Sequence, residues 1–571
     1  MLPIINKKTG LPVKAASILD KFGDEWFQYE CRLIPLPTSF WKEILIAEKP
    51  DLLLVQSAWQ GNNGQWRYRI TDLHLKEKDL ALRNIVRWCK QHHIPTVFWN
   101  IEDPYHFEHF IDAAKEFDYI FTTDGNSIPR YMDIVSHHRV FLLPFGAQPK
   151  IHNPIDKDKG KLGSVGFSGT WHCIGHEARK RDMEIILKPA LPYGVHIYDR
   201  MYHYHQDDNY KFPDIYQPYI RGTVPYEQIG SVYKKYHVFL NVNTIQDSPT
   251  MFSCRIFELL ACGINVISGY ALGIDKMFPG IVKLCKNEED TVRNLELLLN
   301  NKELRDRIAL LGLREVLNKH TYRQRLCTIL DHIGIGHMGK DKPGITCITS
   351  TNRQEFMDNV FENYQRQRYE NKELIVVLNN HRMNIDLWMG KARQYEQVRI
   401  YSVDEGEPLG VCLNYAISQS KYDYIAKMDD DDYYGPEYIG DLMNAFQYTD
   451  ADIVGKHAYY VYFHGSKTLA LKFAEYENCY VNLIAGSTIT AKKHVFQKVP
   501  FVTDRRAGAD TQFLLDCKKN GFKIYSTDRF NFCACRRPRV EEHTFQIDEE
   551  EYLRKCQVVG YLDDFITHVT V

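Results

Sequence analysis

Long hydrophobic runs are missing from this sequence. No stretch of its 571 residues approaches the length of a membrane span, and the first twenty residues lack the basic start and apolar run of a secretory signal. An excess of one charge is missing too, because the formal net charge at pH 7 is only -2. We therefore expect a cytoplasmic protein with no membrane span and no nucleic-acid partner.

Paired cysteines are also missing. The 14 cysteines are scattered through apolar segments, where a reducing compartment would keep them as small buried residues. Cys533 and Cys535 are separated by one residue rather than two, and no second pair accompanies them, so a zinc site is not expected. No internal repeat or low-complexity tract is visible, which argues against a solenoid or a disordered chain.

What the sequence does contain is the material for several α/β cores. Hydrophobic residues make up 44% of the chain, and short apolar runs alternate with amphipathic stretches. This alternation predicts β-α-β units around parallel sheets. Polar or glycine-rich segments interrupt this alternation from Ala147 to Lys161 and from Gly334 to Pro343. We therefore predict three α/β domains, at residues 1-150, 151-335 and 344-571, the first two facing each other across a ligand cleft.

The most informative motif is the acidic run Asp429-Asp430-Asp431-Asp432, which directly follows a predicted buried strand. Four adjacent carboxylates repel one another unless a cation or solvent offsets their charge. Carboxylate oxygens are the ligands that Mg²⁺ and Mn²⁺ prefer, and both ions keep coordination positions open for substrate phosphates. An acidic solvated turn is the alternative, but the carboxyl edge of an α/β sheet favours a metal-assisted ligand site.

Several motifs in the third block occur in a characteristic order. A strand ends at Thr351-Asn352-Arg353, a second strand spans Glu373 to Val377, a Gly-x-x-x-Asn helix spans Gly410 to Asn414, and the acidic run follows. Over about residues 344 to 544 this order resembles the inverting GT-A glycosyltransferases, the nucleotide-diphospho-sugar transferase superfamily. The resemblance implies a GT-A α/β domain with a mixed sheet.

The same resemblance implies roles for individual residues. Asp431 and Asp429, with Asp432 and the C-terminal His543, would bind Mn²⁺ or Mg²⁺, which bridges the donor phosphates. The donor, a nucleotide sugar such as a UDP-sugar, would contact these residues: Thr351, Asn352, Arg353, Asn379, Asn414, Asp429 and Asp430. Many relatives carry aspartate where this chain has Asn379, so the nucleotide itself is not predicted.

Asp510 resembles the acidic residue that begins a helix in this superfamily and supplies the general base. A helix N-terminus keeps a carboxylate ionised, as a base must be. Aspartate at a helix start is also a common N-cap, and this structural alternative stays open. If Asp510 is the base, the acceptor hydroxyl attacks the anomeric carbon opposite the diphosphate, and the sugar configuration inverts.

A second motif lies in the first half of the chain, where a strand, a loop, a helix and a glycine stop run from Phe239 to Gly263. Ser248 with Pro249, or Ser253, is expected to begin the helix, whose N-terminus would suit a diphosphate. This pattern resembles the nucleotide-binding domain of GT-B glycosyltransferases. Over about residues 13 to 330 the amino-acid sequence resembles the spore maturation protein CgeB family.

By this resemblance Glu258 would bind the donor ribose and Arg255 a donor phosphate, with Ser248 and Thr250 beside them. The alternative is an i, i+3 salt bridge on a surface helix. Retaining enzymes often carry glutamate where this chain has Thr250, so a retaining mechanism is not supported.

Glu102 and Asp103 are candidate catalytic carboxylates because they follow a strand at its carboxyl edge and precede a proline. A capped turn would explain them equally well.

These motifs together predict a bifunctional glycosyltransferase that acts on a glycan, a protein or a cell-surface or spore-coat polymer. Two alternatives remain. In the first, only the GT-A half is active and the GT-B half positions the acceptor. In the second, both halves are non-catalytic carbohydrate-binding domains. Oligomeric state is not predicted.

Overall fold

The computed structural model describes residues 10–75, 80–172, 176–203, 210–336, 342–504, 508–539 and 547–571. The chain divides into two compact units. The first consists of residues 1–153 and 160–341, and the second of residues 154–159 and 342–571. His543 lies outside the described residues, as do residues 505–507 next to Asp510.

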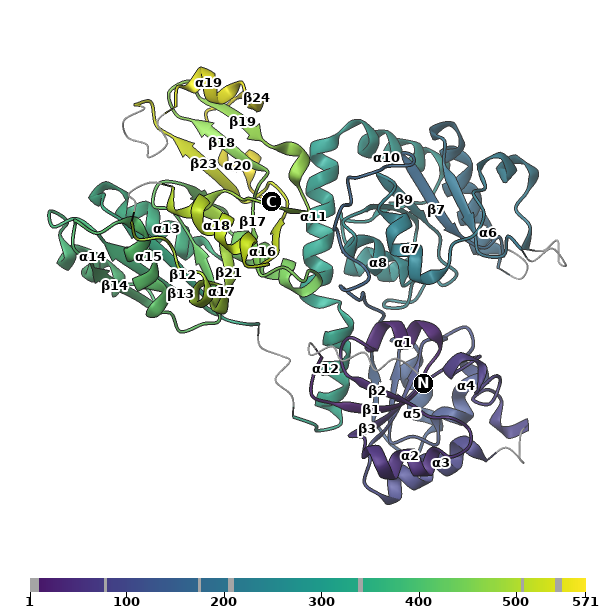
Figure 1. The fold of residues 1–571 in the computed structure, drawn as a ribbon. Coiled ribbons are helices and arrows are strands. Elements are labelled where there is room, and N and C mark those ends of the chain that lie inside the picture. The colour runs from purple at the N-terminus through teal and green to yellow at the C-terminus, as the bar shows by residue number, and fades with distance from the viewer. Residues whose placement is uncertain are drawn as a thin grey trace. The chain divides into compact units, whose positions relative to one another are not determined.

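The first unit begins with a parallel sheet of order β2-β1-β3-β4-β5-β6. Its buried strands alternate their side chains between two hydrophobic cores, because successive residues of a strand point to opposite faces. Figure 1 shows helices on both faces of this sheet. The elements are β1 (Lys14–Ile18), α1 (Lys21–Phe27), β2 (Arg32–Pro35), α2 (Trp41–Glu48), β3 (Leu52–Gln56), α3 (Ala81–Gln91), β4 (Thr96–Asn100), α4 (Phe107–Ala114), β5 (Tyr119–Thr122), α5 (Ser127–Ile134) and β6 (Val140–Leu142).

A second parallel sheet of order β11-β10-β9-β7-β8 completes the first unit. Its elements are β7 (Val165–Gly169), α6 (Glu177–Leu187), β8 (His196–Asp199), α7 (Tyr226–Tyr233), β9 (Val238–Asn241), α8 (Arg255–Ala261), β10 (Asn265–Gly269), α9 (Leu272–Met277), β11 (Lys283–Cys285), α10 (Glu288–Asn300), α11 (Lys302–Lys319) and α12 (Tyr322–His332). Of the two predicted starts of α8, Ser248 with Pro249 is wrong, whereas Ser253 lies one residue before Cys254, the N-cap of a helix that begins at Arg255.

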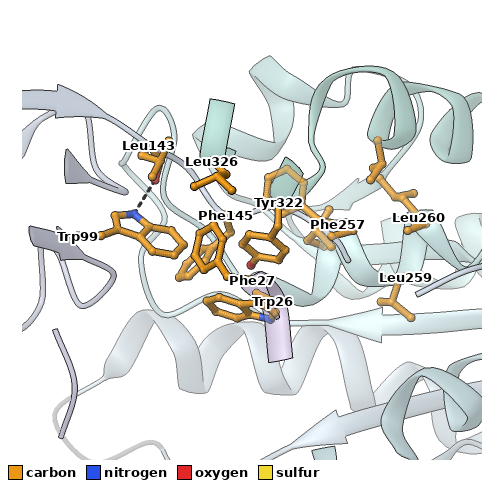
Figure 2. Packing of buried hydrophobic residues seen from close by; sticks show 14 of the residues in the cluster. Trp26, Phe27, Trp99, Leu143, Phe145, Phe257, Leu259, Leu260, Tyr322 and Leu326 are labelled. Atoms are coloured by element: carbon orange, nitrogen blue, oxygen red, sulfur yellow. Dashed lines mark hydrogen bonds between the residues drawn. The ribbon is translucent and has the colours of Figure 1, made fainter. Parts of the chain in front are cut away.

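An aromatic cluster joins the two sheets of the first unit (Figure 2). The ring of Trp26, from α1, stacks on the ring of Tyr322, from α12, with centroids 4.7 Å apart and planes 9° from parallel. Trp99 packs nearby and donates a hydrogen bond from Nε1 to the carbonyl oxygen of Leu143 at 3.0 Å. The last helix of the second sheet therefore packs against the first sheet, and one hydrophobic core spans both.

The second unit contains a mixed sheet of order β14-β13-β12-β15-β21-β17-β22-β20. The pairings from β14 to β15 are parallel, and β21 pairs antiparallel with β15. The elements of this layer are β12 (Ile345–Thr351), α13 (Met357–Arg366), β13 (Lys372–Leu378), α14 (Ile385–Ala392), β14 (Val398–Ser402), α15 (Leu409–Ser418), β15 (Tyr424–Lys427), α16 (Tyr438–Tyr448), β17 (Ile453–Gly455), β20 (Cys479–Val481), β21 (Thr490–Lys492), α17 (Lys493–Lys498), α18 (Ala509–Lys519) and β22 (Ile524–Ser526).

A smaller sheet of order β16-β23-β18-β19-β24 completes the second unit. Its elements are β16 (Tyr433–Tyr434), β18 (Tyr459–Phe463), β19 (Thr468–Lys472), β23 (Phe532–Arg536), α19 (Glu549–Leu553), β24 (Cys556–Tyr561) and α20 (Ile566–Val569). Strand β16 directly follows the acidic run and pairs with β23, so the acidic loop lies between the two sheets. No helix among the described residues is both long and apolar enough to cross a membrane.

Candidate functional site

The turn after β12 organises the acidic loop that follows β15. Thr351 Oγ1 donates a hydrogen bond to Asp430 Oδ2 at 2.5 Å, and Arg353 Nε donates to the same oxygen at 3.1 Å. A second guanidinium nitrogen of Arg353 pairs with Asp430 Oδ1. Burial raises the pKa of Asp430, and Arg353 opposes this effect. Thr351 and Arg353 therefore hold a buried carboxylate in place, an arrangement that favours a supporting role over the predicted donor contact.

Asp431 is held by two arginines. Its Oδ2 accepts hydrogen bonds from Arg353 and from Arg537, each at 3.0 Å. Burial acts to raise the pKa of Asp431, but the two guanidiniums outweigh burial, and the pKa lies below its usual value. Both guanidiniums also lie over the ring of Phe356, 4.5 and 4.8 Å from its centroid. Asp431 is therefore ionised at neutral pH, with two cationic groups beside it.

The other two aspartates are held more weakly. Asp432 Oδ1 accepts a hydrogen bond from the main-chain nitrogen of Cys535 at 3.0 Å. Burial, then the charges of Asp431 and Asp429, raises the pKa of Asp432 well above its ordinary value. Burial raises the pKa of Asp429 to about 6, although Lys427 acts in the opposite direction. Asp429, Asp431 and Asp432 thus repel one another, a condition that a divalent cation relieves.

The fit of a metal ion can be judged from these side chains. Among the described residues, no group of three or more histidine, cysteine, aspartate or glutamate side chains is arranged as a metal site. Mg²⁺ and Mn²⁺ sites in nucleotide-dependent enzymes commonly use one or two carboxylates, with substrate phosphates and water completing the shell. The ionised oxygens of Asp431 fit that donor set. His543 lies outside the described residues, so its predicted role stays a prediction.

Asp510 reaches the same site from the first turn of α18. Lys427, at the end of β15, has a side chain only 3% exposed. Its Nζ lies 2.5 Å from Asp429 Oδ1 and 3.1 Å from Asp510 Oδ2. The second oxygen of Asp510, Oδ1, is buried and has no hydrogen-bond partner among the described residues. Gly508 occupies the N-cap position of α18, and no side chain of the described residues caps this helix. The capping alternative for Asp510 is therefore wrong, because its carboxylate faces Lys427.

The Gly-x-x-x-Asn helix, α15, contacts the segment before α18. Asn414 donates from Nδ2 to the carbonyl oxygen of Phe501 at 2.8 Å and accepts from the Phe501 nitrogen at 3.0 Å. A Cβ on Gly410 would lie 2.0 Å from the carbonyl oxygen of Val502, so only glycine fits there. These contacts favour a supporting role for Asn414 rather than the donor contact that we predicted.

Asn352 and Asn379 follow β12 and β13 at the carboxyl edge of the sheet. The carbonyl oxygen of Asn352 accepts a hydrogen bond from Asn380 at 2.9 Å, and Asn379 Nδ2 donates to the carbonyl oxygen of Asp404 at 2.5 Å. Both lie at the edge where nucleotides bind in open α/β sheets. Their predicted contact with the donor stays a prediction.

In the first unit, charged groups from both sheets come together. Arg255 donates to Asn241 Oδ1 at 3.2 Å. Burial, followed by repulsion from Arg255, lowers the pKa of Arg200, which follows β8. Glu102, which follows β4, interacts electrostatically with Arg200; burial raises the pKa of Glu102, and a hydrogen bond from Trp59 opposes the rise. Two neighbouring guanidiniums form an environment that suits a diphosphate.

Other predicted residues of the first unit lie in its interior. Glu258 is 2% exposed, and its two oxygens accept hydrogen bonds from Tyr226 at 2.7 Å and Tyr233 at 2.9 Å. Asp103 is fully buried, with Oδ2 accepting from Thr122 at 2.6 Å. Burial raises its pKa to about 7. These contacts favour structural roles for Glu258 and Asp103, and they leave Glu102 as the solvent-accessible carboxylate of the predicted pair.

Ser248 and Thr250 connect the two sheets of the first unit. Ser248 Oγ donates to Asp124 Oδ1 at 2.5 Å, and Thr250 Oγ1 donates to the carbonyl oxygen of Thr123 at 2.9 Å. Thr250 Oγ1 also accepts from the nitrogen of Gly125 at 2.9 Å. The two hydroxyls therefore link the loop before α8 to the end of β5, and this link, rather than a donor contact, is what their positions favour.

Sequence reasoning did not single out Lys427 or Arg200. The signal for Lys427 was a single charged residue inside a strand whose last three residues are buried. The signal for Arg200 was a basic residue directly after β8, at the carboxyl edge of a parallel sheet.

Comparisons with known proteins give both halves of the chain a class. Residues 181–331 match the family model described as "Glycosyl transferase-like", and residues 346–516 match "Glycosyl transferase family 2". The first description is broader than the CgeB family that the sequence resembles. No curated protein matches the chain.

Solved structures show weaker likeness. A crystal structure of S. aureus TarS 1-349 is 15% identical, with a TM-score of 0.28, and the match covers 34% of this chain and 60% of TarS 1-349. The same fragment in complex with UDP-GlcNAc is 13% identical, with a TM-score of 0.30 and coverages of 37% and 64%. The mannosyltransferase PcManGT from Pyrobaculum calidifontis, in complex with GDP-Man and Mn2+, is 14% identical, with a TM-score of 0.26 and coverages of 35% and 58%.

The chain thus spans less than two thirds of each of these structures, and at these TM-scores the likeness carries no argument about its site. The two family models match separate parts of the chain, each less than a third of it, and both describe glycosyl transferases. Residues 181–331 and 346–516 are thus similar to glycosyl transferase families, and the fold, in which Rossmann-like domains of GT-B type precede a mixed-sheet domain of GT-A type, agrees with both matches.

Proposed function

We propose that the second unit transfers a sugar, with inversion, from a nucleoside-diphosphate sugar to an acceptor hydroxyl. The observations that support this most directly are an ionised Asp431 and, on helix α18, the carboxylate of Asp510, whose Oδ1 is buried and has no hydrogen-bond partner among the described residues. Inversion requires a base on the acceptor side and charge stabilisation on the leaving-group side. Asp510 would supply the base, and a divalent cation held by Asp431 would supply the charge stabilisation.

Each residue has a defined task in this reaction. Asp510 takes the proton from the acceptor hydroxyl as that oxygen attacks the anomeric carbon. Asp431 would hold Mn²⁺ or Mg²⁺, which when bound stabilises the charge that develops on the departing diphosphate. Arg353 and Arg537 lie against Asp431 and supply further positive charge near the same phosphates.

The test is nucleoside diphosphate release by the full chain from UDP-GlcNAc, UDP-glucose and GDP-mannose, with Mn²⁺, with Mg²⁺ and in excess EDTA. Release is expected to require the metal and to collapse in Asp431→Ala. Asp563→Ala is the control, because Asp563 is an exposed aspartate of the same unit that pairs only with Lys467. Full release by Asp431→Ala, or release that EDTA leaves unchanged, would contradict the proposal.

For the first unit we propose nucleotide-sugar binding without a metal. Arg255 and Arg200 supply positive charge between the two sheets, where a diphosphate would need it. Calorimetry with UDP and GDP in excess EDTA tests this, and Arg255→Gln is expected to weaken binding by about 1 to 3 kcal/mol. If no nucleotide binds in EDTA at millimolar concentration, this half acts as an acceptor-binding scaffold.

The acceptor we propose is a glycan, a protein or a cell-surface polymer, with a spore-coat component suggested by the CgeB resemblance. Two active halves would add two sugars in succession. The competing proposal is a carbohydrate-binding protein without catalysis, and a screen for transfer of labelled sugar to acceptor extracts separates the two.

A further inference from the structure

Lys427 is the one charged side chain of β15 that is almost fully buried beside the acidic loop, with only 3% of it exposed. Burying an ammonium group is costly unless carboxylates surround it. Its Nζ meets two of them, Asp429 at 2.5 Å and Asp510 at 3.1 Å. These two partners come from different elements, the end of β15 and the first turn of α18. The lysine therefore joins the acidic loop to the helix that carries the proposed base.

The way Lys427 meets Asp510 leaves the two carboxylate oxygens unequal. Oδ2 faces the ammonium group, whereas Oδ1 is buried and has no hydrogen-bond partner among the described residues. The backbone supports this orientation, because a Cβ on Gly486 would lie 2.4 Å from Asp510 Oδ2. Lys427 and Gly486 thus both lie against Oδ2, and together they fix the orientation of the carboxylate.

We propose that Lys427 is a positioning residue that fixes the Asp510 carboxylate in the orientation in which it receives the acceptor proton. In that step the O–H bond of the acceptor breaks and an O–H bond forms at the Asp510 carboxylate. The acceptor oxygen bonds to the anomeric carbon, and the bond from that carbon to the diphosphate breaks, its electron pair leaving with the diphosphate. This inference rests on the proposed function, and it adds the group that orients the base.

Lys456 shows what a purely structural buried lysine looks like in the same unit. It is fully buried, and its Nζ donates to the carbonyl oxygen of Asp528 at 2.7 Å and lies 3.3 Å from both Asp528 Oδ1 and Thr527 Oγ1. All three acceptors belong to two adjacent residues far from the acidic run in the sequence. Lys427 differs because its acceptors are the side chains of two elements that meet at the proposed site.

The test is a double-mutant cycle in the full chain with Lys427→Met, Asp510→Asn and the double variant, using the fastest donor among UDP-GlcNAc, UDP-glucose and GDP-mannose. Lys427→Met is expected to lower kcat about 10- to 10²-fold, with KM for the donor near the wild-type value. The double variant is expected to match Asp510→Asn alone, because no base remains to be oriented. Independent, multiplicative losses would overturn the proposal.

Two further variants guard against a simple loss of folding. Lys456→Met is the matched control, expected to lower the melting temperature while the folded enzyme keeps its kcat. Lys427→Arg keeps the positive charge and is expected to recover part of the activity that Lys427→Met loses. Equal losses in Lys427→Arg and Lys427→Met, at equal melting temperatures, would contradict a role for the charge.

Crystal structures of the wild type and of Lys427→Met separate this inference from the proposed function. Support consists of Lys427 Nζ within hydrogen-bond distance of both carboxylates in the wild type, and a rotated Asp510 side chain in the variant. An Asp510 side chain that keeps its orientation without the lysine overturns the inference, whether or not a donor is turned over. Absence of turnover with every donor, beside a rotated Asp510, refutes the proposed function alone.

Discussion

Gly486 lies where the proposed base needs space. A Cβ at this position would stand 2.4 Å from Asp510 Oδ2 and 2.7 Å from Asp510 Cβ, so any larger residue must displace the carboxylate. The short 3₁₀ turn Gly486–Thr488 that contains it is tied to β15 through the hydrogen bond from the Lys427 nitrogen to the Ile489 carbonyl oxygen at 2.8 Å. The turn therefore cannot easily retreat from α18.

We predict that Gly486→Ala lowers sugar transfer by about 10²-fold, the usual effect of moving a catalytic group by about 1 Å. Donor binding should change little, because Asp431 and its arginines are untouched. Steady-state kinetics and calorimetry measure the two effects. Gly390→Ala is the control, since Gly390 lies in α14 with open space around it. Unchanged turnover in Gly486→Ala would show that Asp510 tolerates displacement.

Asp103 gives the first unit a pH dependence. Burial raises its pKa from 3.8 to about 7, so the folded chain keeps this proton to higher pH than the unfolded chain does. The free energy of unfolding should therefore fall as pH rises from about 4 to 7, because ionisation of this buried carboxyl opposes folding.

Replacing Asp103 with asparagine removes that titration. We predict that the difference in stability between wild type and Asp103→Asn shifts in favour of the variant between pH 4 and pH 7. Chemical denaturation at several pH values measures the difference, and the other titrating groups cancel in it. A difference that stays constant over this range would mean that Asp103 ionises in the folded state as it does in the unfolded chain.

The loop before α8 is the element that fastens the two sheets of the first unit. Ser248 Oγ donates to Asp124 and accepts from the main-chain nitrogen of Met251 at 2.9 Å. One hydroxyl thus orders its own loop and binds it to the end of β5. A loop whose main-chain groups depend on a single side chain opens easily once that side chain is removed.

We predict that Ser248→Ala speeds hydrogen exchange at the Met251 amide and costs about 1 to 3 kcal/mol of local stability. Hydrogen-exchange mass spectrometry of residues 244–254 measures this. Ser253→Ala, in the same loop, is the control, because its hydroxyl makes no hydrogen bond among the described residues. A loss of nucleotide affinity with unchanged exchange would instead restore the donor-binding role predicted from the sequence.

At the scale of elements, periodicity predicted much of the fold. Strand β12 and the helix after Pro408 follow from apolar runs and turn residues, and the motif order pointed to both α/β halves. The start of α8 was missed because Ser248 and Pro249 form a plausible helix start, whereas tertiary contacts to Asp124 hold this segment as a loop. Local sequence signals cannot register a partner more than a hundred residues away.

The candidate site was predictable in composition and less so in geometry. The acidic run and Asp510 were identifiable as charged residues at the ends of a strand and a helix. Which aspartate is ionised was not identifiable, because that depends on Arg353 and Arg537 converging on Asp431. The predicted donor contact of Asn414 stays a prediction, since its partner Phe501 is identified only by the folded chain.

At the scale of the whole molecule, residues 154–159 belong to the second unit. In the sequence, however, they stand between the strands of the first sheet and the strands of the second sheet of the first unit. The nitrogen of Asp156 donates to the carbonyl oxygen of Asn478 at 2.8 Å, next to the edge strand β20. Asp156 has a φ of 57°, a value that proline cannot adopt.

We predict that Asp156→Pro in the full chain speeds hydrogen exchange in residues 476–482, because the variant loses both the donor and the required backbone angle. Asp156→Gly is the matched control, since glycine keeps the N–H and accepts a positive φ at no steric cost. Identical exchange in the two variants would show that this strand edge does not depend on the segment.

Because residues 154–159 belong to the second unit, the chain cannot be divided into its two units by a single cut. The chain passes between its two units three times, after residues 153, 159 and 341. After a single protease cut in residues 337–341, residues 154–159 of the second unit would still be covalently connected to the first unit. In a chimera in which residues 342–571 come from another protein, residues 154–159 would likewise have to pack against a foreign surface. Recombination at one junction is therefore insufficient to exchange either unit, and a hybrid must carry its own version of these six residues with it.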